Sequence, residues 1–396
     1  MKITALLSLA VAVLAVSEAT PVARRPHPDG HAVPLTRREN FRHNTPAQIR
    51  KLNARYPQLQ IKAAGSTGSV PLTDVSPDLE YYGSVNVGTP AQVFKLDFDT
   101  GSSDIWFPSS TCTTSACTAH TRFNSAKSST YQADGRKWSI SYGDGSSASG
   151  ILGSDLVSVG GISVRQTIGL ATKESSQFGS SPEDGLFGLG FDTIESVSGV
   201  KTFLDNAISA GVLAQPVVSV FLPSERLFNG QGGAYLFGGI DSTKYTGSLT
   251  YVPVTQEGYW QILVQDASFN GVSLKQTSQG IVDTGTTLII VGDAAAAAIH
   301  AKIPGSTNDP NNGWLVPCSA ASSTANVGFK LGGVTFNVPV ADLAYEDLGD
   351  GSGNCFSGVQ GGQDGLWILG DVFIKNNYCV FSQTSSPSIG IAPLKH

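Results

Sequence analysis

The chain has 396 residues, of which 40% are hydrophobic and only 14% charged, and 45 are glycine. This composition argues against a helical bundle, whose exposed faces need Lys and Glu, and favours many strands joined by tight turns. The length allows two domains or one large one, and the apolar content is ample for a packed core.

Residues 1–19 contain Lys2, an apolar run from Ile3 to Val16 and small residues that end at Ala19. This pattern predicts a secretory signal peptide, because the apolar run is too short and wrongly flanked for a membrane span. No later stretch of the sequence is long enough to cross a bilayer. We therefore expect a secreted, extracellular protein without a membrane partner.

Charge divides the rest of the chain into two parts. Residues 20–67 hold nine Lys or Arg against two acidic residues, whereas residues 68–396 hold 15 basic and 28 acidic residues. The contrast predicts a basic pro-segment held on an acidic body, an attraction that acid weakens by protonating carboxylates. A disordered basic linker is the alternative. Nucleic-acid binding is not expected, because the basic part is short and lacks interleaved aromatic residues.

From about residue 70 the chain reads as short runs rich in Val, Ile, Phe, Tyr and Thr, interrupted by Gly, Pro, Ser and Asp. Such runs predict strands and hairpins. Helices are expected at few places, one after Thr202, where apolar residues recur at helical spacing, and one from Asp293, where an Asp cap precedes strong helix formers. The predicted fold class is therefore all-β, with a few short helices.

The tripeptide Asp-Thr-Gly occurs twice, at residues 99–101 and 283–285. At roughly 5% usage per residue type, a given tripeptide has odds of about 1 in 8,000 per position, which argues against chance. Each copy precedes an apolar-Leu-Gly run by a similar distance, and these runs end at Gly190 and Gly370. We infer an internal duplication that gives two β lobes related by a pseudo-two-fold axis.

Strand alternation places Phe94, Leu96 and Phe98 on one face and Asp97 and Asp99 on the other. In the turns that follow, glycine allows close approach of the backbone, and the neighbouring amides and hydroxyls can hydrogen-bond the carboxylates. The residues expected to support the carboxylates of Asp99 and Asp283 in this way are Thr100, Gly101, Ser102, Thr284, Gly285 and Thr286. The two threonines are expected to reach across to the opposite turn.

Two carboxylates about 3 Å apart cannot both ionise, so they share one proton. The charged member can activate a water molecule while the protonated member donates to a carbonyl oxygen. This chemistry is general acid–base hydrolysis of an amide without a covalent intermediate.

An ordered set of segments resembles the pepsin-type aspartic endopeptidases (family A1, EC 3.4.23), and above all the fungal rhizopuspepsins. The segments are DLEYYGSVNVGTPAQ, DFDTGSSDIW, WSISYGDGSSASGIL, DGLFGLGFDTI, IVDTGTTL and KNNYCVF. The resemblance implies a bilobal fold with a central active-site cleft, an N-terminal lobe over residues 68–248 and a C-terminal lobe over residues 249–396. It further implies polypeptide substrates, pepstatin-type inhibitors, a monomer, and neither a cofactor nor a metal.

The resemblance also implies roles for individual residues. Asp99 and Asp283 match the catalytic pair of the family. The residues that match the flap and its surroundings are Tyr142, which closes over substrate, Gly143 and Asp144, which contact substrate, and Trp106, which steadies the tyrosine.

Five cysteines fit an oxidising compartment. On spacing alone, Cys112 can pair with Cys117 and Cys318 with Cys355, although other pairings remain open. The resemblance implies these two disulfides. Cys379 lies in an apolar run, where a buried free thiol is expected; it departs from the family pattern.

Two further features concern specificity and activation. Asp97 and Asp144 would give the cleft a negative side, since the residue that matches Asp97 in the second half is Ile281. We therefore expect tolerance of Lys before the scissile bond, alongside large apolar residues; the alternative is that Asp97 and Asp144 are solvated carboxylates.

Arg55 in the segment NARYPQ resembles the zymogen residue that contacts the catalytic pair. This resemblance implies activation by acid, with a mature start between residues 63 and 70.

Other classes of function fit the sequence less well. A serine hydrolase needs a His base, and His120, His300 and His396 have no triad context. No metal-hydrolase motif occurs, and a glycosidase would not explain duplicated Asp-Thr-Gly turns. A non-enzymatic binding protein on the same fold is the remaining alternative, although such relatives usually lose a catalytic Asp, a turn Gly or the flap Tyr, all of which are intact here.

Overall fold

The computed structural model describes residues 66–75, 80–143, 145–228, 233–362 and 364–395. The predicted signal peptide, nearly all of the predicted pro-segment with Arg55, and Asp144 lie outside these residues. The strands of the first part are β1 Gly68–Val75, β2 Glu80–Val87, β3 Gln92–Asp99, β4 Ile105–Pro108, β5 Gln132–Ser141, β6 Ser147–Val159, β7 Ile162–Glu174, β8 Gly185–Gly188, β9 Val217–Phe221 and β10 Ala234–Phe237.

The second part of the chain is also dominated by strands. These are β11 Thr250–Pro253, β12 Gln261–Phe269, β13 Val272–Ser273, β14 Ser278–Val282, β15 Ile289–Ile290, β16 Thr307–Asp309, β17 Gly313–Pro317, β18 Asn326–Leu331, β19 Val334–Pro339, β20 Ala344–Asp347, β21 Asn354–Ser357, β22 Val359–Gln360, β23 Leu366–Leu369, β24 Asn377–Ser382 and β25 Ser388–Pro393.

The helices are short. The α-helices are α2 Ser115–Ala119, α3 Phe203–Ser209, α4 Glu225–Phe228, α5 Asp293–His300 and α6 Asp371–Ile374. The 3-10 helices are η2 Ser125–Lys127, η3 Ser176–Ser180, η4 Asp192–Ile194, η5 Cys318–Ser322 and η6 Val340–Asp342. The expectation of a mostly β protein with few short helices is confirmed.

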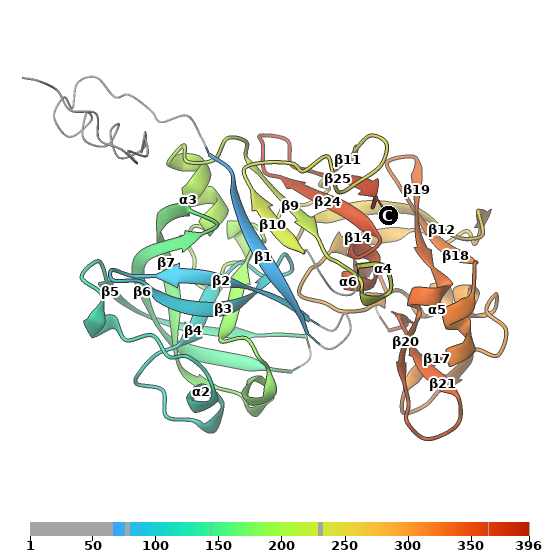
Figure 1. Ribbon diagram of the computed structural model, residues 1–396, viewed down its shortest axis with the longest axis horizontal. Helices are drawn as coiled ribbons and strands as arrows, with labels where there is room; N and C mark the ends of the chain where they lie inside the picture. Colours follow the sequence, from blue (N-terminus) through green and yellow to red (C-terminus); the bar gives the residue numbers. More distant parts are fainter. Residues whose placement is uncertain (1–65, 76–79, 144, 229–232, 363, 396) are drawn as a thin grey trace, which may run out of the picture.

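One sheet of 13 strands runs through the molecule in the order β11-β25-β24-β9-β10-β1-β2-β3-β8-β4-β7-β6-β5. In Figure 1 the strands β9, β10, β24 and β25 lie between two lobes, one built around β2–β7 and the other around β12 and β17–β21. Near the end of the chain, β24 thus pairs with β9 of the first part, and β25 lies between β24 and β11. The lobe boundary at residues 248 and 249 remains a prediction, and it falls between β10 and β11.

The two halves repeat one arrangement of strands. The strand before the first Asp-Thr-Gly turn, β3, pairs in parallel with β8, and the strand before the second, β14, pairs in parallel with β23. The strand after each turn, β4 or β15, then pairs antiparallel with that same partner. The partner strands β8 and β23 come from the two echoed apolar-Leu-Gly runs. The bilobal pepsin-like fold expected from the duplication is thereby confirmed.

Sequence patterns explain the local structure of both predicted helices. Thr202 caps α3 and forms a reciprocal capping box with Asp205, as the Thr-containing segment suggested. The Asp cap predicted for α5 is wrong by one residue: Gly292 occupies the cap and Asp293 is the first helical residue. Asp293 still lies in the first turn, where its charge favours the positive end of the helix dipole.

The core is built from the inward faces of the strands. Phe94, Leu96 and Phe98 of β3 are fully buried, whereas Lys95 is exposed, as the alternation predicted.

A charged contact also joins the two parts of the chain. Arg226 of α4 donates two hydrogen bonds to Asp342, from Nε to Oδ1 at 2.6 Å and from Nη2 to Oδ2 at 2.8 Å.

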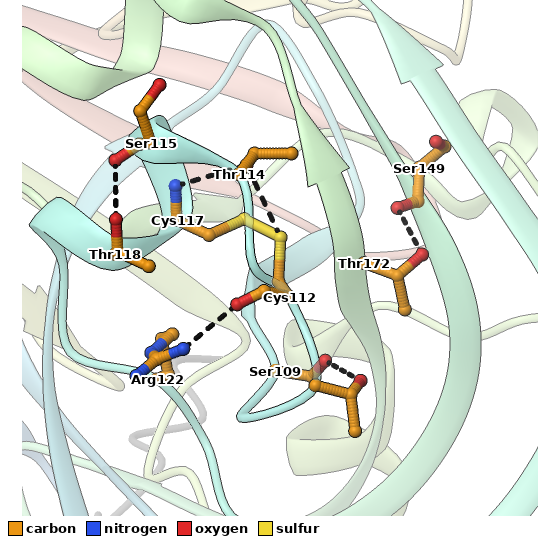
Figure 2. The surroundings of a disulfide bond; sticks show 10 residues. Ser109, Cys112, Thr114, Ser115, Cys117, Thr118, Arg122, Ser149 and Thr172 are labelled. Carbon is orange, nitrogen blue, oxygen red and sulfur yellow. Dashed lines mark hydrogen bonds between the residues drawn. A yellow bond between two sulfur atoms is a disulfide. The ribbon is translucent and has the colours of Figure 1, made fainter.

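Both proposed cysteine pairs are bonded in the structure, Cys112 with Cys117 and Cys318 with Cys355. Figure 2 shows the first bond beside α2, where Arg122 Nη1 donates to the Cys112 carbonyl at 2.9 Å. Cys379 is free and fully buried in β24, as its apolar surroundings suggested. Burial raises the pKa of this thiol.

Among the described residues, no helix has the length and hydropathy needed to span a membrane.

Candidate active site

The two Asp-Thr-Gly turns meet at the centre of the molecule. Asp99 ends β3 and Asp283 directly follows β14, and the two side chains are 5% and 6% exposed. Backbone hydrogen bonds tie each aspartate to the neighbouring partner strand, from Leu189 N to the Asp99 carbonyl at 2.7 Å and from Asp283 N to the Leu369 carbonyl at 3.1 Å. The repeated strand arrangement therefore brings together two carboxylates that are 184 residues apart.

Each carboxylate is held by its own turn. The Gly101 amide donates to Asp99 Oδ1 at 2.7 Å, and the Ser102 hydroxyl donates to Asp99 Oδ2. In the second turn the Gly285 amide donates to Asp283 Oδ1 at 3.0 Å, and the Thr286 hydroxyl donates to Oδ2 at 2.6 Å. These four contacts fix the orientation of both carboxylates.

The threonines of the two turns bond across the pseudo-two-fold axis. Each backbone amide donates to the hydroxyl of the opposite threonine at 3.0 Å. Each hydroxyl in turn donates to a carbonyl of the opposite strand, Thr100 to Val282 at 2.9 Å and Thr284 to Phe98 at 2.5 Å. The predicted crossing of the threonines thus takes the form of a closed, symmetric set of buried hydrogen bonds.

The two glycines show how closely the turns approach. A Cβ atom on Gly101 would collide with the Asp283 carboxylate, and one on Gly285 would collide with the Asp99 carboxylate. Any side chain at either position would push the opposite carboxylate away. Glycine is required here by the close approach of the two turns and not by an unusual backbone angle.

Burial and mutual repulsion change the protonation of the pair. Burial is the main cause that raises the pKa of Asp99, and the negative charge of Asp283 raises it further. The hydrogen bonds from Ser102 and Gly101 favour the charged form and oppose this shift. The net direction is upward, so the pair holds a proton at pH values where an ordinary Asp would have lost it.

A hairpin of β5 and β6 carries the predicted flap residues. Tyr142 is half-buried, and its hydroxyl accepts a hydrogen bond from Trp106 Nε1 at 2.6 Å. Its ring packs edge-on against Phe178. Burial raises the pKa of Tyr142, and the charge of Asp99 is the second cause, which indicates that the tyrosine lies near the aspartate pair. A Cβ atom on Gly143 would meet no neighbour, so the hairpin tip is open there.

The two halves differ at the residue two positions before each aspartate. Asp97 is half-buried and its charge also contributes to the raised pKa of Tyr142. Ile281, at the matching position of the second half, is buried.

Two residues near the site were missed by sequence reasoning. Asp104 is 5% exposed and accepts hydrogen bonds from Trp138 Nε1 at 2.7 Å and from Ser196 Oγ at 2.8 Å. Tyr235 donates its hydroxyl to the Phe98 carbonyl at 2.8 Å, directly behind the first turn. Asp104 belongs to the segment FDTGSSD, but a single acidic residue in a turn carries no pattern that would reveal its partners.

Among the described residues, no group of three or more His, Cys, Asp or Glu residues is placed to hold a metal ion. His300 lies 2.8 Å from the Ser357 hydroxyl, but both residues are buried, Ser357 completely, and substrate cannot reach them.

Comparison with known proteins identifies the class. A family model of the eukaryotic aspartyl proteases matches residues 80–394. The chain belongs to this family and is an aspartic endopeptidase, so the resemblance noted in the sequence is confirmed.

Three relatives show how far the likeness extends. The chain is 44% identical to rhizopuspepsin-2 of Rhizopus niveus over 404 residues, which cover 100% of both chains. It is 40% identical to syncephapepsin of Syncephalastrum racemosum over 407 residues, again 100% of both. It is 42% identical to pepsin A of Callithrix jacchus over 344 residues, which cover 85% of this chain and 86% of pepsin A.

The threonine contacts yield a testable prediction. Thr100→Val keeps the shape of the side chain but removes the hydroxyl, so that the Val282 carbonyl and the Thr284 amide lose a buried partner. We expect a loss of about 1–3 kcal/mol in the free energy of unfolding, measured by denaturant titration, together with a reduced kcat on a peptide substrate. Thr100→Ser, which keeps the hydroxyl, is the control. A Thr100→Val protein as stable and active as the wild type would contradict the assigned contacts.

Proposed function

We propose that this chain is an acid endopeptidase in which Asp99 and Asp283 share one proton and act together as general acid and general base. The observation that carries the proposal is the mutual approach of the two turns, in which each glycine lies against the opposite carboxylate. The amides and hydroxyls of residues 101, 102, 285 and 286 support the proposal, because they orient both carboxylates before substrate arrives.

The reaction follows from the shared proton. The charged carboxylate takes a proton from a water molecule, which attacks the carbonyl carbon of the peptide bond, while the protonated carboxyl donates to the carbonyl oxygen. Collapse of the tetrahedral intermediate with protonation of the nitrogen releases the amine. The proton is a property of the pair and not of one aspartate. No metal or cofactor is needed.

The flap hairpin completes the proposed site. The hydrogen bond from Trp106 holds the hydroxyl of Tyr142 in place, and the open tip at Gly143 leaves room for a substrate backbone. Closure of such a hairpin excludes water and fixes the substrate. Polypeptides are the proposed substrates, a pepstatin-type compound the expected inhibitor, and a monomer the expected working form.

The dyad gives the central prediction. Asp99→Asn and Asp283→Asn should each lower kcat by about 10⁴-fold or more, because removal of one member of a cooperating pair removes most of the catalysis. Because the pKa of Asp99 is raised, the pair keeps its proton in acid and loses it only as pH rises through that pKa, so the wild-type rate should fall at the upper end of the pH range. Hydrolysis of a denatured protein between pH 2 and 8, with and without pepstatin, measures both effects. An active Asn variant would refute the dyad.

We further propose that the negative side of the site admits Lys before the scissile bond, alongside large apolar residues. The half-buried Asp97, close to Tyr142, supports this proposal, and Asp144 is proposed as a second contributor from the sequence. An ammonium group loses part of its hydration when it enters an apolar site. Carboxylates at the edge of the site attract the ammonium group and offset this loss.

Peptides that differ only in Lys or Phe at this position test the specificity. Asp97→Asn and Asp144→Ala should each lower the Lys-to-Phe ratio of kcat/KM by about tenfold, since an ion pair of about 1.4 kcal/mol is lost. Asp350→Asn, at an exposed carboxylate of the second part of the chain, is the matched control. A ratio that stays unchanged in both test variants would contradict the proposal.

The last part of the proposal concerns biosynthesis: a secreted zymogen whose basic pro-segment, with Arg55, lies against the aspartate pair. The opposite charges of residues 20–67 and 68–396 support it. Acid should weaken the attraction by protonating carboxylates of the body.

Incubation of the full-length chain at pH 3 should shorten it to a start between residues 63 and 70, which N-terminal sequencing would detect. Asp99→Asn should remain full-length unless wild-type enzyme is added. A wild-type chain that stays intact in acid would refute activation by acid.

A further inference from the structure

The strand β5 of the flap hairpin carries a buried tryptophan that the proposed reaction does not use. Trp138 is 3% exposed, and its Nε1 donates to Asp104 Oδ1 at 2.7 Å. A buried indole N–H needs an acceptor, because otherwise nothing replaces the hydration that it loses. Among the described residues, Asp104 supplies that acceptor.

Asp104 is itself held in place by the first lobe. It directly precedes β4, and the Gly188 amide donates to its backbone carbonyl at 3.0 Å. The amide and the hydroxyl of Ser196 donate to its Oδ2 at 3.1 and 2.8 Å. The carboxyl oxygen that faces Trp138 therefore has a fixed position.

The flap strand and the start of β4 exchange two indole hydrogen bonds. Trp138 of β5 donates to Asp104, and Trp106 of β4 donates to the hydroxyl of Tyr142 at 2.6 Å. Trp138 and Tyr142 are four residues apart and face the same side, since side chains alternate along a strand. The hairpin is thus attached to β4 at two points, with one donor on each partner.

The rings between these two points leave little room for movement. Trp106 and Trp138 belong to a small hydrophobic cluster that is separate from the main core, and their ring centroids are 5.8 Å apart. Phe178 packs edge-on against Trp106 at 5.0 Å between centroids. A Cβ atom on Gly169 of β7 would lie 2.9 Å from an atom of each tryptophan. A displacement of Trp138 would therefore move Trp106, and with it the donor that holds Tyr142.

We propose that Asp104 and Trp138 are a pair of positioning residues, whose hydrogen bond fixes the flap strand on β4 and so keeps Tyr142 within reach of Trp106. The inference rests on the proposed function, since it assigns Tyr142 the role of flap tyrosine. Asp104 and Trp138 contact neither substrate nor the aspartate pair in this proposal, and they act through Trp106 and Tyr142. Loss of their bond should therefore weaken substrate binding more than the chemical step.

Three variants isolate the hydrogen bond, and a fourth is the control. Trp138→Phe removes the indole N–H and keeps an aromatic ring in the small cluster. Asp104→Ala removes the acceptor, whereas Asp104→Asn keeps an oxygen that can accept from Trp138. Trp260→Phe is the matched control, because Trp260 is 1% exposed, donates Nε1 to the Leu189 carbonyl at 2.8 Å and packs in the main core.

The measurements are made at acid pH on the full chain after activation. They are kcat and KM on a peptide, Tm, and hydrogen exchange of residues 137–141 and 147–151, which form the two strands of the flap hairpin next to its tip.

We expect Trp138→Phe and Asp104→Ala each to raise KM about fivefold with a smaller change in kcat, as for the loss of one hydrogen bond. Exchange in the flap hairpin should become faster by about the same factor, because local opening becomes easier. Asp104→Asn should keep wild-type KM and exchange. Trp260→Phe should lower Tm as Trp138→Phe does, but leave flap exchange unchanged.

A double-mutant cycle tests whether the two residues act through one bond. In Asp104→Ala the indole of Trp138 has already lost its acceptor, so the further change Trp138→Phe should alter KM and exchange little. Effects of the two changes that multiply would overturn the proposal. Wild-type exchange in Trp138→Phe would also overturn it, as would equally fast flap exchange in Trp260→Phe.

The outcome does not depend on a single variant or on hydrolysis. If Asp104→Ala does not fold, the comparison of Trp138→Phe with Trp260→Phe decides, because both variants keep an aromatic ring. Exchange and Tm test the pair even if the proposed proteolysis fails. Peptide hydrolysis together with wild-type flap exchange in Trp138→Phe would overturn the pair and leave the proposed function intact.

Discussion

The reciprocal hydrogen bonds between Thr100 and Thr284 are the interaction on which the rest of the site depends. Two buried carboxylates repel each other and lose hydration, so nothing in their own chemistry brings them together. The threonines offset this cost, because each amide and each hydroxyl finds its partner in the opposite turn. Neither turn has its buried groups satisfied without the other, and the two halves of the chain must associate.

That same association sets the protonation of the pair. In the proposed mechanism the turns, once held together, relieve the repulsion by keeping one proton between the two carboxylates, in agreement with the upward shift of the Asp99 pKa. The glycines at 101 and 285 permit the approach, and the hydroxyls of Ser102 and Thr286 prevent the carboxylates from turning away. An acid enzyme is therefore a consequence of the packing between the turns.

Patterns that repeat in the sequence allowed the meeting of the two turns to be predicted, and features without a pattern did not. The duplicated tripeptide pointed to two matching turns, and the alternation around Phe98 gave the correct faces of β3. Asp104 was missed because its partners Trp138 and Ser196 are 34 and 92 residues distant, so the spacing does not reveal the contacts. The pairing of β24 with β9 was also out of reach, because it joins the end of the chain to its first part through tertiary packing.

The residues that break the symmetry lie mostly in the first half. Asp97 corresponds to Ile281, and Asp104 corresponds by position to Leu288, which packs against the main core. A symmetric pair suffices to share a proton, but a peptide has a direction, so the two sides of the site must present different groups to it. In this chain the acidic side chains and the flap belong to the same half. The carboxylate proposed for a substrate ammonium group and the proposed flap tyrosine therefore come from the same half of the chain.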